Sequence, residues 1–191
     1  RSIETGNDVP EIINVIVEIP KGSMNKYEYD KKHNMIKLDR VLFSPFHYPG
    51  DYGLIPQTLS EDGDPLDALV LVTNSTYPGI LIESRPIGLL KMEDDGEPDD
   101  KIICVSTNDP RYLHTADIEN IEDHYRSEIA HFFQVYKELE GKKVEIIGWK
   151  DAKEAKKVVI ESIKRYKETL KKYWNANKLR TFSTKKRKHF P

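Results

Sequence analysis

The sequence predicts an α+β fold with its sheet closed as a small barrel. Short β-branched runs separated by turn residues fill the first two thirds of the 191-residue chain. A helical period of apolar residues appears only after about residue 120. Many short strands followed by two helices are typical of an α+β domain, and for strands this short a small barrel is the favoured sheet.

The predicted strands are short apolar or alternating segments, most of them next to Gly, Pro, Asn or Asp. They cover residues 12–19, 25–30, 35–42, 68–73, 80–85, 87–92, 102–106 and 144–149. Residues 43–60 hold three prolines and two glycines, which excludes a helix there. That segment is expected to be a loop with short extended pieces.

Two helices are predicted in the C-terminal half of the chain, packed on the barrel. The apolar residues Ile129, Phe132, Phe133 and Tyr136 recur at i, i+3, i+4 and i+7, which predicts a helix over 121–139 that stops at Gly141. A second helix begins at Asp151, an N-cap residue, and runs through residue 174. Its predicted buried face consists of Ala155, Val158, Val159, Ser162 and Tyr166.

The length is that of one globular domain, and the charge is unevenly distributed along it. The formal net charge is −2, but residues 171–191 hold eight Lys and Arg and no acid, so the rest of the chain carries −10. We expect a single catalytic domain over 1–174 and a basic tail over 175–191. An acidic body argues against nucleic-acid binding by bulk charge.

The single cysteine, Cys104, lies in an apolar run and can form no intrachain disulfide, which favours a reducing compartment. No run approaches the roughly 20 apolar residues of a membrane span. We therefore expect a cytoplasmic protein that binds no membrane. The chain opens on Arg1, which leaves open whether a leader preceded it.

The most unusual segment is EDGDPLD at residues 61–67, which places four carboxylates directly before the apolar run 68–72. Like charges this close repel one another, and burying them unpaired is costly. A second acidic segment, residues 93–100, has six acids in eight residues. Oxygen ligands of this kind select Mg²⁺, Mn²⁺ or Ca²⁺ over softer metals.

The acidic segments also allow two other interpretations. An EF-hand loop starting at Asp62 fails, because it needs Gly where Asp67 stands and Glu where Thr73 stands. Alternatively, both segments are solvated hairpin tips, an interpretation that fits residues 93–100 better than 61–67. Lysines and an arginine elsewhere in the chain favour a third interpretation, since metals and cations together neutralise phosphate oxygens in phosphoryl chemistry.

At this point the sequence resembles a known family. Residues 62–67 match the D-x-D-P-x-D signature of the soluble family I inorganic pyrophosphatases, and the likeness extends from about Val9 to Trp149. Further blocks resemble the family in the same order: 16–20 (IVEIP), 25–28 (NKYE), 39–40 (DR), 48–53 (YPGDYG), 90–92 (LKM), 130–133 (AHFF) and 136–137 (YK).

The resemblance implies a five-stranded OB-like barrel that holds several Mg²⁺ ions, with Mn²⁺ as a substitute. Asp64 matches the carboxylate regarded as the general base. The positions matching metal ligands, including two that face the metal shell, are Asp62, Asp67, Asp94, Asp99, Glu18 and Glu28. The positions matching phosphate-binding groups are Lys26, Arg40, Tyr52, Lys101, Tyr136 and Lys137.

The expected reaction is Mg²⁺-dependent hydrolysis of pyrophosphate to two orthophosphates by direct attack of a metal-bound hydroxide. The resemblance also implies a homo-oligomer, with the hexamer of short family members favoured. Two rivals remain: a Mg²⁺- or Ca²⁺-binding structural module without turnover, and an OB-type nucleic-acid binder, which would need aromatic side chains on a basic face.

Overall fold

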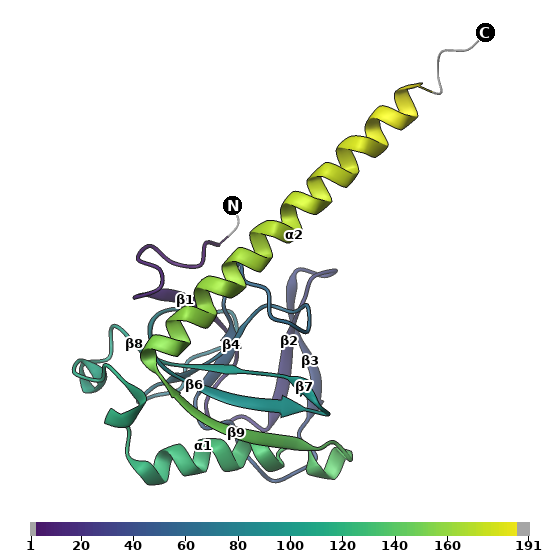
Figure 1. The fold of residues 1–191 in the computed structure, drawn as a ribbon. Helices are drawn as coiled ribbons and strands as arrows, with labels where there is room; N and C mark the ends of the chain where they lie inside the picture. The colour runs from purple at the N-terminus through teal and green to yellow at the C-terminus, as the bar shows by residue number, and fades with distance from the viewer. Residues whose placement is uncertain (1–2, 187–191) are drawn as a thin grey trace.

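Five strands form a closed ring in the computed structural model, which describes residues 3–186 and the side chains of residues 3–175 (Figure 1). Around the ring the order is β1–β4–β5–β8–β6, and β6 pairs with β1 to close it. These strands are β1 (Ile13–Ile19), β4 (Asp51–Leu54), β5 (Asp67–Leu71), β6 (Leu81–Asp94) and β8 (Lys101–Ser106). The predicted α+β fold with a small closed five-stranded sheet is confirmed.

The pairing of β5 with β8 is parallel, whereas the other pairings in the ring are antiparallel. Asp67, the first residue of β5, lies opposite Lys101, the first residue of β8. The two acidic segments each lead into one of these strands. The parallel register therefore brings both acidic segments to the same rim of the ring.

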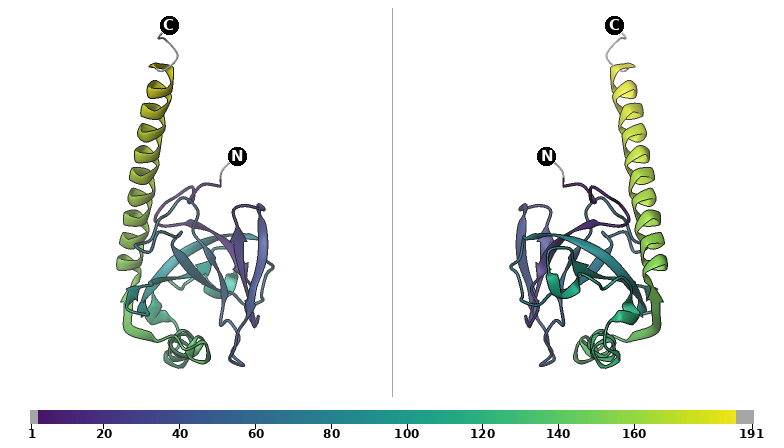
Figure 2. Two further views of the ribbon diagram at one scale, coloured as in Figure 1. Left: turned by 90° about the vertical axis from the view of Figure 1, so that its right-hand side faces the viewer. Right: turned by 90° about the vertical axis from the view of Figure 1, so that its left-hand side faces the viewer.

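A hairpin of β2 (Asn25–Asp30) and β3 (Met35–Val41) forms a separate sheet, on the side of the ring away from α2 (Figure 2). Two more strands pair with β6 in antiparallel orientation: the two-residue β7 (Glu97–Pro98) and β9 (Val144–Asp151). Lys26 lies opposite Arg40 in the hairpin.

Alternate residues of β5 enter two different core clusters, as expected for a strand buried on both faces. Leu69 and Leu71 pack in the cluster that includes α1 (Asp123–Val135), through Ile129, Phe132 and Phe133. Ala68 and Val70 belong to the cluster that includes α2 (Ala152–Lys186), through Ala155 and Val159.

Within residues 3–186 there are also three short 3₁₀ helices: η1 (Pro110–Tyr112), η2 (Ile118–Asn120) and η3 (Glu138–Glu140). The helix predicted over 121–139 is thus two elements, because α1 ends at Val135 and η3 follows. Gly141 does end this segment, with φ of 75°. Asp151 is the predicted N-cap of α2, since its Oδ1 accepts from the Glu154 N–H at 2.8 Å.

The short extended pieces predicted within residues 43–60 include β4, in which Gly53 is required because a Cβ there would lie 2.0 Å from the Ile16 carbonyl oxygen. Two other predictions of element bounds were wrong. Strands 80–85 and 87–92 are one strand, β6, whose register against β8 shifts between Pro86 and Gly88. α2 continues to Lys186, beyond its predicted end at residue 174 (Figure 1). In the described part of the chain, no helix is long and apolar enough to cross a membrane.

Candidate active site

A cavity of about 1100 Å³ opens where the acidic rim of the ring faces the β2 strand. Twelve of the thirteen predicted site residues line it, and they come from six parts of the chain. They are Glu18, Lys26, Glu28, Tyr52, Asp62, Asp64, Asp67, Asp94, Asp99, Lys101, Tyr136 and Lys137. The exception is Arg40, which is not among the lining residues.

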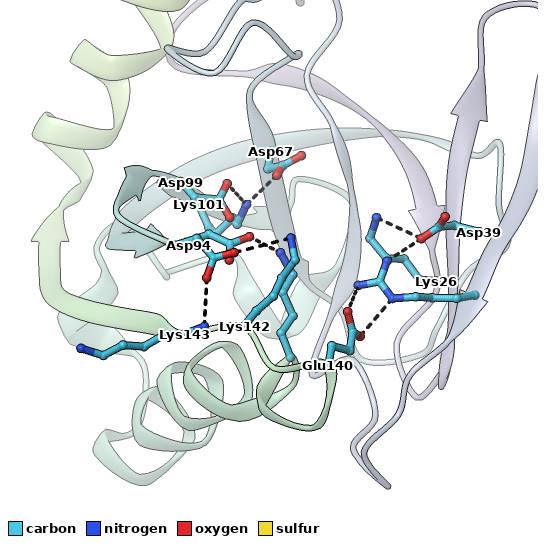
Figure 3. Close-up of polar contacts among 12 residues, drawn as sticks. Lys26, Asp39, Asp67, Asp94, Asp99, Lys101, Glu140, Lys142 and Lys143 are labelled. Atoms are coloured by element: carbon cyan, nitrogen blue, oxygen red, sulfur yellow. Dashed lines mark hydrogen bonds and ion pairs between the residues drawn. The ribbon is translucent and has the colours of Figure 1, made fainter.

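Lys101 is the best-held cation of the cavity, with only 2% of its side chain exposed. Its Nζ donates to Asp67 at 2.6 Å and to Asp99 at 2.5 Å (Figure 3). The Tyr52 hydroxyl donates to the same Asp67 oxygen at 2.5 Å. Burial alone would lower the pKa of Lys101, but the negative charges of Asp67 and Asp99 outweigh it and raise the pKa above the ordinary value.

Lys137 neutralises Asp94 as Lys101 neutralises Asp67 and Asp99, because Lys137 Nζ forms an ion pair with Asp94 Oδ2. The other oxygen of that carboxylate, Oδ1, is buried and has no hydrogen-bond partner. Lys137 follows Tyr136, the residue after the end of α1, and its Nζ lies 5.2 Å from the centre of the Tyr136 ring. The early end of α1 therefore places both residues at the cavity wall.

Glu18 lies near the end of β1, and 8% of its surface is exposed. Burial is the main cause that raises the pKa of Glu18 from 4.5 to about 7, and the charge of Asp67 adds to the rise. The Tyr29 N–H donates to Glu18 Oε1 at 2.7 Å and opposes this rise. Glu18 thus connects the ring to the hairpin through one hydrogen bond.

Asp62 and Asp64 lie in the first acidic loop. Asp62 Oδ1 accepts a hydrogen bond from the Asp64 N–H at 2.9 Å. This local turn contact sets the position of the Asp62 carboxylate relative to residue 64. Burial raises the pKa of Asp62, and this hydrogen bond opposes the rise. Asp64 is exposed to the cavity and therefore accessible to a small solute.

On the hairpin wall, Lys26 pairs with Glu28 and lies 3.6 Å from an Asp39 oxygen. Arg40 pairs with the same Asp39 oxygen at 2.5 Å and with Glu140 of η3 through two hydrogen bonds (Figure 3). Arg40 therefore lies beside the cavity, joined to it through Asp39 and Lys26.

The donor set of the cavity suits a hard divalent cation. Its lining includes ten carboxylates and six lysines, an excess of four formal negative charges. The unpaired Asp94 Oδ1 is a buried acceptor that a cation would satisfy. In the described residues, however, no three His, Cys, Asp or Glu side chains are arranged to hold a metal ion. Asp67, Asp94 and Asp99 each pair with a lysine through one carboxylate oxygen, so the second oxygen of each is the one available to a cation.

Tyr166, Asp39 and Glu140 belong to this region but were not among the predicted site residues. Tyr166 of α2 lines the cavity, although its helical spacing indicated only a buried face. Asp39 and Glu140 hold Arg40. No local pattern could have found Glu140 as a partner, since it lies 100 residues from Arg40 in the sequence.

Comparison with known proteins agrees with this geometry. The sequence model described as "Inorganic pyrophosphatase" matches residues 15–167. The inorganic pyrophosphatase of Halalkalibacterium halodurans is 51% identical over 158 residues, which cover 83% of this chain and 97% of that protein. That of Haloferax volcanii is 51% identical over 169 residues, covering 88% and 96% of the two chains.

The crystal structure of the inorganic pyrophosphatase from Thermus thermophilus has the same fold. It superposes with a TM-score of 0.85 at 48% identity, covering 87% of this chain and 97% of that one. Sequence and fold therefore agree over the part of the chain that builds the cavity, and this chain belongs to the inorganic pyrophosphatase family.

Proposed function

We propose that the protein hydrolyses inorganic pyrophosphate to two orthophosphates in a Mg²⁺-dependent reaction, without a covalent enzyme intermediate. The observation that carries the proposal is the lining of one cavity by carboxylates and lysines side by side, with one buried carboxylate oxygen unpaired. A polyanion accompanied by divalent cations is complementary to such a lining.

The residues proposed to hold Mg²⁺, or Mn²⁺ in its place, are Asp62, Asp67, Asp94 and Asp99, with Glu18 and Glu28 beside them. When bound, the metal ions neutralise phosphate oxygens and lower the pKa of water. With metal ions bound to Asp67, Asp94 and Asp99, Lys101 and Lys137 would no longer be needed to balance the negative charge of these carboxylates. Those lysines would then be available to the substrate.

Asp64 is the proposed general base. A water oxygen attacks one phosphorus, the bond from that phosphorus to the bridging oxygen breaks, and the water proton passes to the Asp64 carboxylate. The exposed position of Asp64 in the cavity supports this role. Charge builds on the leaving phosphate, where fixed cations stabilise it. The proposed phosphate-binding groups are Lys26, Arg40, Tyr52, Lys101, Tyr136 and Lys137.

The test is phosphate release from pyrophosphate with and without Mg²⁺. We expect turnover only with a divalent cation, and Asp64→Asn should retain fold and metal binding while kcat falls by at least about 100-fold. Glu61→Gln is the matched control, because Glu61 is exposed. Among the described residues, its carboxylate forms only one ion pair, with Glu61 Oε1 lying 3.9 Å from Arg165 Nη1. The activity of this variant should be unchanged.

Two outcomes would refute these assignments. Metal binding without phosphate release would favour a structural cation-binding module. Near-normal turnover by Asp64→Asn would refute its role as general base while leaving the proposed function intact.

We further propose that the protein acts in the cytoplasm as a homo-oligomer, with residues 1–174 as the catalytic domain. Size measurement in solution tests the expected hexamer.

A further inference from the structure

The ion pair between Arg40 and Glu140 connects the two sides of the cavity. Arg40 is on β3, next to Lys26 of β2, and Glu140 is on η3, just after Tyr136 and Lys137. Arg40 Nε and Nη2 donate to the two Glu140 oxygens at 3.0 and 2.8 Å. Within residues 3–175 it is the only ion pair that links the hairpin to residues 136–143.

The ion pair with Glu140 uses the Nε and Nη2 edge of the Arg40 guanidinium and leaves other N–H groups without a partner. Of the five N–H bonds of Arg40, two point to Glu140 and one, on Nη1, to Asp39 at 2.5 Å. One N–H on Nη1 and one on Nη2 have no partner among the described side chains. Donors on two neighbouring nitrogens of a guanidinium can match two phosphate oxygens.

Burial makes this arrangement fixed rather than transient. The Glu140 side chain is 10% exposed and that of Arg40 is 26% exposed. Burial opposes the charge of Arg40, but the hydrogen bonds with Glu140 and Asp39 raise its pKa above the ordinary value. Separating the pair would leave a largely buried carboxylate without a counter-charge, which is strongly unfavourable.

We propose that Glu140 is a positioning residue that orients Arg40 toward pyrophosphate without contacting the substrate itself. By occupying the Nε edge, Glu140 fixes the plane of the guanidinium and keeps one N–H on Nη1 and one on Nη2 available. Through Asp39, the same contact limits where Lys26 can lie. This inference rests on the proposed function, because it assigns Arg40 a phosphate group of that substrate.

The experiment compares steady-state kinetics of Glu140→Gln with those of wild type and of Glu138→Gln, in saturating Mg²⁺. Glu138 is the matched control, since it is exposed on the same turn and forms no ion pair within residues 3–175. We expect Glu140→Gln to raise KM about tenfold with kcat changed less than about threefold, because one charge-assisted hydrogen bond is lost. Glu138→Gln should match wild type.

A double-mutant cycle separates positioning from a general structural role. Arg40→Ala should raise KM by itself, and adding Glu140→Gln to it should cause no further rise. Thermal melting checks that each variant is folded, and Glu140→Asp, which keeps the charge but shortens the side chain, should give an intermediate KM.

Three results would overturn the inference. The first is equal KM values for Glu140→Gln and Glu138→Gln, and the second is the same rise in KM from Glu140→Gln with and without Arg40. The third is absence of turnover by wild type with Mg²⁺, which would refute the proposed function and this inference together. The first two leave the proposed function intact, so the two failures are distinguishable.

Discussion

The two walls of the cavity hold their lysines differently. On the ring, Lys101 is 2% exposed and its Nζ contacts two carboxylates, with the Tyr52 ring centre 5.7 Å away. On the hairpin, Lys26 is 19% exposed and its main partner, Glu28, is 55% exposed. The Lys101 ammonium group, on the ring wall, is therefore held in place before any ligand binds. The Lys26 ammonium group, on the hairpin wall, stays in contact with water.

This difference indicates a division of labour. A buried, doubly paired lysine costs much to disturb and defines the shape of the site. A partly solvated pair contributes little to stability, so it can exchange partners when a phosphate enters. Three substitutions test the contrast.

The largest effect is expected for Lys101→Met in metal-free protein. The substitution leaves Asp67 and Asp99 facing each other without a cation, so the free energy of unfolding should fall by about 3 kcal/mol. Urea denaturation at pH 7.5 measures it. Lys91→Met is the control, because Lys91 is 39% exposed and lies 3.9 Å from Asp100. A loss equal to that of Lys91→Met would contradict the special position of Lys101.

A smaller effect of opposite sign is expected for Glu18→Gln in metal-free protein. The folded-state pKa of Glu18 is raised to about 7, so below pH 4.5 the group is protonated in both states and destabilises nothing. As the pH rises from 4.5 to about 7, the unfolded chain loses this proton first, and wild-type stability falls. Glutamine avoids that loss and still accepts from the Tyr29 N–H.

Glu18→Gln should therefore be more stable than wild type at pH 8 by less than about 3 kcal/mol, because the exposed part of the side chain reduces the effect of the pKa shift. The difference should nearly vanish at pH 4.5. Chemical denaturation at both values measures it, and an equal difference at the two would show that the titration of Glu18 is not its cause.

The smallest effect on stability is expected for Lys26→Met, on the hairpin wall. Because the pair with Glu28 is partly solvated, the free energy of unfolding should change by less than about 1 kcal/mol. KM for pyrophosphate should nevertheless rise, since a proposed phosphate contact is removed. The same urea titration and the kinetic assay measure the two quantities. A stability loss comparable to that of Lys101→Met would erase the contrast between the walls.

Sequence alone predicted those features that depend on local patterns. The β-branched runs predicted most strands, and the spacing of Ile129, Phe132 and Phe133 predicted the buried face of α1. The acidic segments predicted a site lined by carboxylates, and both segments line the cavity. That these carboxylates bind a cation stays a prediction, which rests on the cost of leaving such charges without neutralisation. The individual site residues came from the family resemblance, and all but Arg40 line one cavity.

Features that depend on distant contacts were predicted only coarsely or were missed. The sequence predicted short extended pieces within residues 43–60, but the bounds of β4 follow from its pairing with β1 and β5. β6 continues through Pro86 because the shift in register against β8 accommodates the missing N–H. The Arg40–Glu140 pair joins residues 100 positions apart, and no propensity or period encodes such a contact.

The parallel pairing of β5 with β8 also has a consequence for how the chain folds. Asp67 and Lys101 are separated by 34 residues, and joining parallel strands carries a loop-closure entropy cost that local contacts do not. Until these strands meet, the carboxylates of both acidic segments repel one another with no buried ammonium between them. We expect completion of the ring and neutralisation of its rim to be one cooperative step, so that refolding kinetics and site assembly share a single barrier.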